Sequence, residues 1–481
     1  MNRKMVFYTT GHILILEAIL FMLPLLCSVI YGEASSVIAF AISAGVALGT
    51  GLIISALSYT KNKLIYAKEG FAIVALAWLA VSAVGALPFV IGNFIPSYVD
   101  AFFETVSGFT TTGATILDDI EALSHGMLFW RSFTHWIGGM GVLVFLMAIL
   151  PTDSGRSIHI MRAEVPGPIV GKIVPKIRET AKILYFIYIG LTALMAVFLL
   201  LGGMSLFESL THTFGTAGTG GFGIKNDSIA SYSPYIQWVI TAFMLIFGIN
   251  FNLFYLIIIG KFASAIKSRE LWCFGAIVAI STCAIAMNVH TLFANTSEAI
   301  RHSAFQVASI ISTTGFSSSD IIINLWPGFS KMIFLTLMFI GGCAGSTAGG
   351  LKVSRIMILC KTAKRDLNKM LHPRSVGVVK HEGRVVDSAT VSNASVYLIV
   401  YFLIFFALLI LISLEPFGFE TAFSAVASCF NNVGPAFGAA ASSYSGFSVL
   451  SKICLSFAML FGRLEIFPLL LVFSPTTWKR K

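Results

Sequence analysis

The feature that most constrains this chain is a succession of long apolar segments separated by short polar connections. Hydrophobic residues make up 57% of its 481 residues and charged residues only 11%, whereas charged residues make up about 25% of a soluble domain. We count about a dozen segments of roughly 20 apolar residues, the length that spans the hydrocarbon core of a bilayer. The sequence therefore predicts an all-α polytopic membrane protein.

The basic residues indicate how such a protein is oriented. Most of the 32 Lys and Arg fall in six clusters, at 3–4, 61–68, 156–182, 261–269, 352–384 and 479–481. The clusters lie at alternate ends of the apolar segments, so the positive-inside rule places all six, and both chain ends, on the cytoplasmic side. This topology, with contacts to anionic membrane lipid, accounts for the net charge of +10 without a nucleic-acid partner.

A short motif recurs four times between the apolar segments. In the first copy, "GFTTTGAT", the central glycine is Gly113, and the matching glycines are Gly221, Gly315 and Gly434. Two residues before these glycines stand Thr111, Thr219, Thr313 and Asn432, and six before stand the small residues Ser107, Gly215, Ser309 and Ser428. This shared register favours fourfold pseudosymmetry over the alternative of four polar external loops with turn glycines.

The stretch before the first motif predicts a short helix that enters the membrane and stops midway. Residues 99–110 would form a helix of about 18 Å, roughly half of the hydrocarbon thickness. We therefore predict two additional N-terminal transmembrane helices (1–68) and then four pseudo-symmetric M1–P–M2 units around one pore. Each unit is a membrane helix, a re-entrant pore helix and a second membrane helix; the units cover residues 69–180, 181–269, 270–388 and 389–481.

The four motifs have the composition of a filter for cations. Irregular backbone at mid-membrane depth is tolerated only inside protein or along water, and a ring of carbonyls can replace the hydration shell of a cation. Glycine permits the required backbone angles, and the pore helices would point their negative C-terminal dipole ends at the ion. The predicted ion-binding residues, acting mainly through backbone carbonyls, are Thr111, Thr112, Gly113, Thr219, Gly220, Gly221, Thr313, Thr314, Gly315, Asn432, Val433 and Gly434.

A glycine-rich stretch, "GGCAGSTAGG", interrupts the second membrane helix of the third unit. Each glycine disfavours helix by about 1 kcal/mol relative to alanine, and a helix broken at mid-membrane is expected only beside a cavity. The alternative is a helix-packing surface of small residues. The stretch consists of Gly341, Gly342, Cys343, Ala344, Gly345, Ser346, Thr347, Ala348, Gly349 and Gly350.

Two further sets of polar residues lie in or near apolar segments. Arg463 and Glu465 lie inside the final segment, where a charge usually faces the protein interior or water. Alternatively, these two residues pair with each other or extend to the membrane boundary. Arg131 and His135 begin an apolar segment in aromatic company, "FWRSFTHW", and we expect them to be anchors at the outer interface.

Several of these stretches resemble the Trk/Ktr/HKT superfamily of potassium-uptake proteins, and the two additional N-terminal helices resemble its TrkH branch. The resemblance covers nearly the whole chain and includes "TTGAT", "TGGF", "TTGF", "NNVGP", "MRAEVPGPI", "LHPRSV" and "FGRLEIFPLL". It implies a filter that binds potassium, because Gly113 stands where a serine accompanies sodium selectivity. It also implies that residues 341–350 form an intramembrane gate beneath the filter, with Arg463 reaching into the pore. The glycine-rich second motif, "GTAGTGGFG", departs from the family pattern.

The resemblance further implies a homodimer in the bacterial cytoplasmic (inner) membrane whose cytoplasmic face docks a separate RCK-type, TrkA-like regulatory subunit. That partner would bind nucleotide (ATP, ADP or NAD(H)). The stretches at 151–182 and 352–388 are too short for a nucleotide-binding domain, so we expect no cofactor in this chain other than transported K⁺, and no enzymatic activity. The alternative function is a symporter that couples K⁺ to Na⁺ or H⁺. That class usually has inverted repeats, whereas these four repeats are parallel.

Overall fold

The computed structural model describes residues 1–61, 65–141, 177–318, 325–375 and 377–479. Within these ranges six helices are long and apolar enough to cross a membrane, and a bent pair of helices, Pro234–Phe247 and Phe251–Ile258, makes a seventh span if counted as one. This confirms a helical, polytopic membrane protein. Within these ranges the spans are fewer than the dozen apolar segments of the sequence, because several of those segments form helices that are broken or shorter than a bilayer requires, and residues 142–150 of one segment lie outside the described residues.

The helices of the first half of the chain are α1 (Arg3–Leu20), α2 (Met22–Ile30), α3 (Ala34–Leu57), α4 (Ala67–Gly85), α5 (Leu87–Ile91), α6 (Tyr98–Phe109), α7 (His125–Met140), α10 (Ile177–Leu201), α11 (Leu206–Ala217), α12 (Pro234–Phe247), α13 (Phe251–Ile258) and α14 (Phe262–Ile266). The second half contains α15 (Arg269–Val289), η1 (His290–Leu292), α16 (Thr296–Ile311), α17 (Gly328–Ile340), α18 (Val353–Leu371), β1 (Lys380–His381), β2 (Arg384–Val385), α19 (Ser388–Ile412), α20 (Phe419–Asn431), η3 (Gly438–Ala440), α21 (Val449–Arg463), α22 (Phe467–Phe473) and α23 (Pro475–Trp478). The short helix expected at 99–110 is α6.

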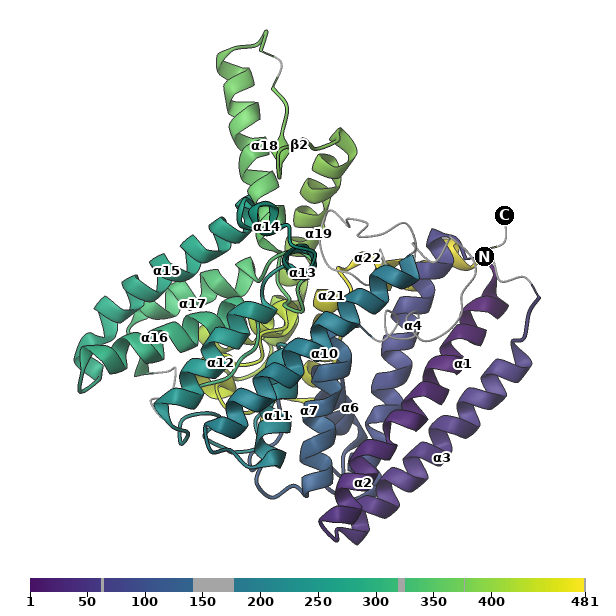
Figure 1. The fold of residues 1–481 in the computed structure, drawn as a ribbon. Helices are drawn as coiled ribbons and strands as arrows, with labels where there is room; N and C mark the ends of the chain where they lie inside the picture. The colour runs from purple at the N-terminus through teal and green to yellow at the C-terminus, as the bar shows by residue number, and fades with distance from the viewer. Residues whose placement is uncertain (62–64, 142–176, 319–324, 376, 480–481) are drawn as a thin grey trace.

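Eight of these helices contact one another in a closed ring. In order around the ring they are α6, α7, α11, α12, α16, α17, α20 and α21, and α21 returns to contact α6. The ring alternates the helices that precede the glycine motifs with helices that follow them. Helices α4, α10, α15 and α19 each pack against one of the short helices α6, α11, α16 and α20. Figure 1 shows α1 and α3 at one edge of the molecule and α15 to α17 at the opposite edge.

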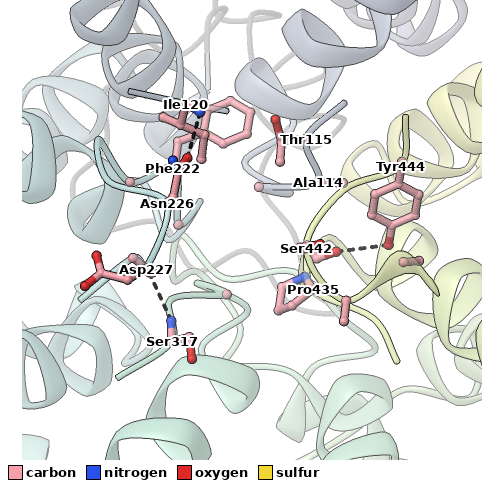
Figure 2. A pocket seen from close by; sticks show the side chains of 18 of the residues that line it. Ala114, Thr115, Ile120, Phe222, Asn226, Asp227, Ser317, Pro435, Ser442 and Tyr444 are labelled. Atoms are coloured by element: carbon pink, nitrogen blue, oxygen red, sulfur yellow. Dashed lines mark hydrogen bonds between the residues drawn. The ribbon is translucent and has the colours of Figure 1, made fainter. Parts of the chain in front are cut away.

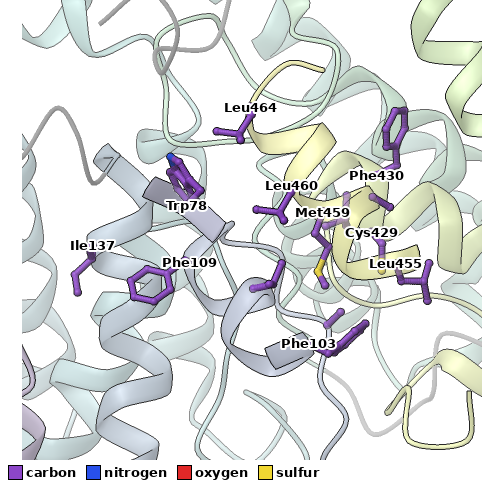
Figure 3. Packing of buried hydrophobic residues seen from close by; sticks show 14 of the residues in the cluster. Trp78, Phe103, Phe109, Ile137, Cys429, Phe430, Leu455, Met459, Leu460 and Leu464 are labelled. Atoms are coloured by element: carbon purple, nitrogen blue, oxygen red, sulfur yellow. The ribbon is translucent and has the colours of Figure 1, made fainter. Parts of the chain in front are cut away.

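The ring is closed by contacts between the beginning and the end of the chain. Trp78 of α4, Phe109 of α6 and Leu460 of α21 belong to one continuous hydrophobic core, and Figure 3 shows these side chains lying around the same space. An ion pair adds to this contact, with Lys452 Nζ of α21 lying 2.7 Å from Asp100 Oδ1 of α6. Burial of apolar side chains therefore fixes the last helix of the ring against the first.

Helix α18 and the hairpin of β1 and β2 project beyond the helical body (Figure 1). The hairpin turns through Glu382 and Gly383, whose φ angles are 47° and 76°, as a two-residue type I′ turn requires. The two ends of the chain lie together, because the Arg3 guanidinium donates to the backbone carbonyl of Trp478 at 2.5 Å. Both ends lie on the side of the molecule toward which α18 projects (Figure 1).

Candidate functional site

The four short helices end in the same way. In each, the N–H before the motif glycine donates to the carbonyl five residues earlier: Thr112 to Ser107 at 2.9 Å, Gly220 to Gly215 at 2.8 Å, Thr314 to Ser309 at 2.8 Å and Val433 to Ser428 at 2.9 Å. The residue before each of these donors has a left-handed φ: Thr111 54°, Thr219 55°, Thr313 56° and Asn432 56°. These features define a Schellman helix end. The small residue that stands six positions before each motif glycine is the one whose carbonyl accepts the hydrogen bond that closes this helix end.

The motif glycines are required by both conformation and space. Their φ angles are 82° at Gly113, 78° at Gly221, 87° at Gly315 and 100° at Gly434, in the left-handed half of the map that disfavours side chains. We call the non-helical segments around these glycines, residues 111–115, 219–223, 313–317 and 432–436, the first to fourth strands; they are distinct from β1 and β2. A Cβ on each glycine would lie at or within 2.5 Å of a carbonyl oxygen of the next strand; the four pairs are Gly113 with Gly220, Gly221 with Thr314, Gly315 with Val433, and Gly434 with Thr112. The pairs run in a closed circle, so the four strands surround one axis.

One cavity opens onto all four strands. Its volume is about 550 Å³, and its lining includes the four motif glycines. Figure 2 shows Ala114 and Thr115 from the first strand around it, with Phe222, Ser317 and Pro435 from the other three. A solute in this cavity would have access to every strand at once.

Two threonine hydroxyl groups of the motifs hydrogen-bond to neighbouring segments and so hold the strands in place. Thr112 Oγ1 accepts from Asn432 Nδ2 at 2.9 Å, which joins the first strand to the fourth. Thr313 Oγ1 accepts from the backbone N–H of Gly349 at 2.6 Å, which joins the third strand to the glycine-rich stretch. The twelve residues proposed from sequence therefore lie on four neighbouring strands around one axis. The side chains of Thr112, Thr313 and Asn432 make hydrogen bonds within the protein.

Arg131 and His135 were wrongly expected at the outer interface. Both are buried. Arg131 Nε lies 2.8 Å from Glu104 Oε1, and its guanidinium carbon is 4.1 Å from the ring centroid of Phe222. His135 Nδ1 lies 2.7 Å from the carbonyl oxygen of Gly108. Both side chains hold the first two strands in place, and the charge of Arg131 is compensated by an acidic side chain on α6.

His135 also explains why the second motif is so rich in glycine. The backbone N–H of Phe222 donates to His135 Nε2 at 3.2 Å. A Cβ on Gly220 would lie within 2.5 Å of the imidazole ring, and a Cβ on Gly218 would lie within 2.5 Å of the His135 carbonyl group. The additional glycines therefore make room for this histidine and leave the strand with the same backbone geometry as the other three.

The glycine-rich stretch 341–350 lies in the non-helical connection between α17 and α18. It is held inside the protein, because Thr347 Oγ1 donates to the carbonyl of Phe247 at 3.2 Å and the N–H of Gly349 donates to Thr313. A Cβ on Gly349 would lie 2.5 Å from the carbonyl oxygen of Asn431. The stretch thus breaks the helix, as its composition predicts, and packs directly against the third and fourth strands.

Arg463, the last residue of α21, joins this stretch to the first strand. Its Nη1 donates to Thr111 Oγ1 at 3.1 Å and to the carbonyl of Thr347 at 2.8 Å. Its Nη2 donates to the carbonyls of Gly138 and Gly139 at the end of α7. The guanidinium is buried and is surrounded by oxygen atoms from three separate elements: the hydroxyl of Thr111, the backbone carbonyl of Thr347 and two backbone carbonyls at the end of α7.

The chain reverses sharply after Arg463. Glu465 and Ile466 have φ angles of 53° and 65°, a conformation that costs about 1–3 kcal/mol for each non-glycine residue. Ile466 is fully buried, and Glu465 Oε2 lies 2.7 Å from Arg355 Nη2 of α18. The break between α21 and α22 is therefore held by packing and by an ion pair to the helix that follows the glycine-rich stretch.

Sequence reasoning missed three buried charged residues beside the site. Glu104 pairs with Arg131, Lys352 donates to the carbonyl of Ala348, and Glu270 accepts a hydrogen bond from the glycine-rich stretch. The sequence feature that could have identified these residues is a charge in largely apolar surroundings, because such a charge usually marks an interior or functional position in a membrane protein.

Comparison with known proteins gives the family. The model of the TrkH family, described as cation transport proteins, matches residues 39–480. The chain belongs to the TrkH family. The Trk system potassium uptake protein TrkH of Escherichia coli (strain K12) is 36% identical over 476 residues, which cover 98% of each chain. TrkG of the same strain, also a Trk system potassium uptake protein, is 32% identical over 421 residues, 86% of each chain.

A solved structure supports the same assignment. The crystal structure of the potassium transporter TrkH from Vibrio parahaemolyticus is 33% identical, matches with a TM-score of 0.89 and covers 100% of both chains. The resemblance inferred from the sequence motifs is confirmed. This TrkH-family chain therefore shares its fold along its full length with a solved potassium transporter, and the family is one of cation transport proteins, not a class of enzymes.

Proposed function

We propose that this TrkH-family protein takes up K⁺ through a selective pore formed by its four motif strands. The observation that carries the proposal is the closed circle of strands, in which each motif glycine abuts a carbonyl oxygen of its neighbour. All four glycines also line one cavity. Rings of backbone carbonyls can replace the water around a dehydrated cation. The choice of K⁺ is supported by the relatives, which are named potassium uptake proteins.

The electrostatics of the strands suit a cation. Helices α6, α11, α16 and α20 all end at the strands, so each directs about half a negative charge toward their common axis. Because the hydroxyls of Thr112 and Thr313 are engaged in contacts within the protein, the backbone carbonyls are the groups available to the ion. The protein would then coordinate K⁺ without a fixed carboxylate.

In this proposal the stretch 341–350 is the gate and Arg463 contributes to it. The stretch is bonded to the third strand through Gly349, and Arg463 bonds both to the stretch and to the first strand. A positive charge at this position would raise the barrier to cations. Movement of the stretch away from the strands would remove both the obstruction and a contact of Arg463.

The driving force would be the K⁺ gradient and the membrane potential across the bacterial cytoplasmic membrane. A potential of about 100 mV supplies about 2.3 kcal/mol for each elementary charge. The proposed orientation has both chain ends on the cytoplasmic side. It is supported by the contact between Arg3 and Trp478, which brings the two ends together, and by the basic clusters of the sequence.

Uptake of a radioactive Rb⁺ tracer tests the function. Purified protein in liposomes loaded with K⁺ should accumulate external Rb⁺ well above empty liposomes, and a K⁺ ionophore should abolish the difference. Liposomes loaded with Na⁺ should accumulate far less. Equal accumulation with either internal ion would contradict K⁺ selectivity, and uptake that requires an imposed Na⁺ or H⁺ gradient would support the symporter instead.

The projecting helix α18 supports a cytosolic partner. It exposes Leu367, Met370 and Leu371, with 61%, 78% and 75% of their surfaces accessible, beside exposed Lys364 and Lys369. An apolar patch rimmed by charge typically marks a protein contact. We propose that an RCK-type, nucleotide-binding subunit docks here on a homodimer of this chain, and that its movement reaches the gate through α18.

Replacing both Leu367 and Met370 with glutamine should weaken this docking by about a hundredfold or more, because each buried apolar side chain contributes about 1.5–3 kcal/mol and about 1.4 kcal/mol is a tenfold change. Both side chains are exposed, so the fold should be unaffected. Co-purification of the cytosolic subunit and nucleotide-dependent flux are the measurements. Asn368→Ala, at an exposed position of the same helix, is the control. Full binding by the double variant would rule out docking through α18.

A further inference from the structure

The start of α15 is joined to the glycine-rich stretch by one carboxylate. Glu270 is the second residue of α15 and is only 4% exposed. Its Oε1 accepts from the backbone N–H of Ala344 at 2.8 Å and from that of Ser354 at 3.2 Å. Ala344 lies within the stretch, and Ser354 lies in the first turn of α18. A single side chain therefore contacts both the middle of the stretch and the start of the helix that follows it.

A second carboxylate, from the hairpin of β1 and β2, contacts the same helix end. Glu382 Oε1 accepts from the backbone N–H of Glu270 at 2.9 Å and from Ser268 Oγ at 3.3 Å. Ser268 is the N-cap of α15, and the first N–H groups of a helix favour an anion because they have no partner within the helix. The hairpin thus caps α15, while α15 holds the glycine-rich stretch.

The hairpin is in turn attached to α18 and α19. Ile358 of α18, Val379 before the hairpin and Val391 of α19 form a small hydrophobic cluster separate from the main core. Lys361 Nζ of α18 donates to the carbonyl of Lys380 at 2.9 Å. Because these contacts link the hairpin to α18, a displacement of the projecting helix would also displace Glu382.

We propose that Glu270 is a positioning residue that holds the stretch 341–350 in place beneath the strands, and that Glu382 makes this hold depend on the hairpin. A partner that shifts α18 and the hairpin would withdraw Glu382 from the start of α15 and loosen the contact of Glu270 with Ala344. The consequence for transport rests on the proposed gate. The attachment of the stretch to Glu270 does not depend on the gate, and its strength can be measured without any ion.

Two native cysteines can be used to measure how firmly Glu270 holds the stretch in place. Cys343, next to Ala344, is fully buried, whereas Cys360 on α18 is exposed and serves as an internal reference. The full-length protein is treated with a maleimide, and mass spectrometry gives the labelling of each cysteine. Glu270→Ala should raise the labelling of Cys343 relative to Cys360 about tenfold, equivalent to about 1.4 kcal/mol.

Graded variants distinguish positioning from general damage. Glu270→Gln should raise the labelling less than Glu270→Ala, because its amide oxygen still accepts a hydrogen bond. Glu382→Ala, which removes the accepting oxygens, should raise the labelling of Cys343 in the wild-type background but have little further effect once Glu270 is replaced. The control is Glu179→Gln, at the start of α10, where the side chain is half-exposed. It should leave the labelling of Cys343 unchanged.

Thermal melting and gel filtration identify folded variants. A folded Glu270→Ala protein whose Cys343 stays as protected as in the wild type would overturn the role of Glu270, and equal effects of Glu382→Ala in both backgrounds would overturn its dependence on the hairpin. Rb⁺ uptake by the same variants tests the gate separately. Increased labelling without increased uptake would contradict the gate and leave the role of Glu270 standing.

Discussion

Replacing Gly113 with serine should lower the permeability ratio of K⁺ to Na⁺ about tenfold, which corresponds to about 1.4 kcal/mol. Gly113 has a φ of 82°, and a Cβ there would lie within 2.5 Å of the carbonyl oxygen of Gly220 on the neighbouring strand. The added atoms must therefore displace one of the oxygens that we assign to the ion. Reversal potentials in liposomes with both ions would give the ratio.

Gly203 provides the matched control. Its φ is 92°, so serine meets comparable backbone strain there, yet a Cβ would have nothing within 4 Å. Gly203→Ser should keep the wild-type ratio. Serine at Gly221, Gly315 or Gly434 should shift the ratio in the same direction as at Gly113, because their neighbours are equivalent. A Gly113→Ser protein with the wild-type ratio would contradict the assignment of this strand to the filter.

Deleting residues 345–349 should raise K⁺ flux about tenfold or more and reduce its dependence on any cytosolic regulator. The deletion removes the contacts of Thr347 with Arg463 and of Gly349 with the third strand, and with them the obstruction that we propose beneath the strands. Arg463→Gln should act in the same direction, because a unit charge about 4 Å from a cation contributes about 4 kcal/mol at an effective dielectric constant of about 20. Tracer flux per protein molecule is the measurement.

The control for Arg463 is Arg301→Gln, which removes a cation that pairs with Glu298 on α16 and should leave the flux unchanged. Gel filtration and thermal melting would show whether the deletion protein folds. A folded deletion protein with wild-type or lower flux would favour the alternative in which small residues at 341–350 serve only to pack helices.

The register of the four motifs was predictable because it follows from local backbone rules. A Schellman end fixes a left-handed residue at a set distance from the last helical turn, and the next left-handed position, at Gly113 and its equivalents, admits little besides glycine. Thr111 and Gly113 therefore carry a signal that needs no knowledge of the fold. The boundaries of the four M1–P–M2 units are not fixed by any such local rule and stay a prediction.

The partners of the buried charges could not be predicted in this way. Arg131 stands at the start of an apolar segment, where a membrane-boundary role is the ordinary expectation, and its partner Glu104 becomes a neighbour only when α6 packs on α7. Arg355 and Glu465 are 110 residues apart in sequence. Which residue pairs with which is determined in these cases by tertiary packing, and the sequence pattern around each residue does not indicate that packing.

The most direct test of the central claim is the reversal potential of the wild-type protein with K⁺ on one side of the membrane and Na⁺ on the other. If four strands of backbone carbonyls form a K⁺-selective pore, the potential should lie close to the K⁺ equilibrium value and should follow it as the K⁺ gradient is changed. A reversal potential that stays near zero under a K⁺/Na⁺ gradient, or that moves with the proton gradient instead, would contradict the account.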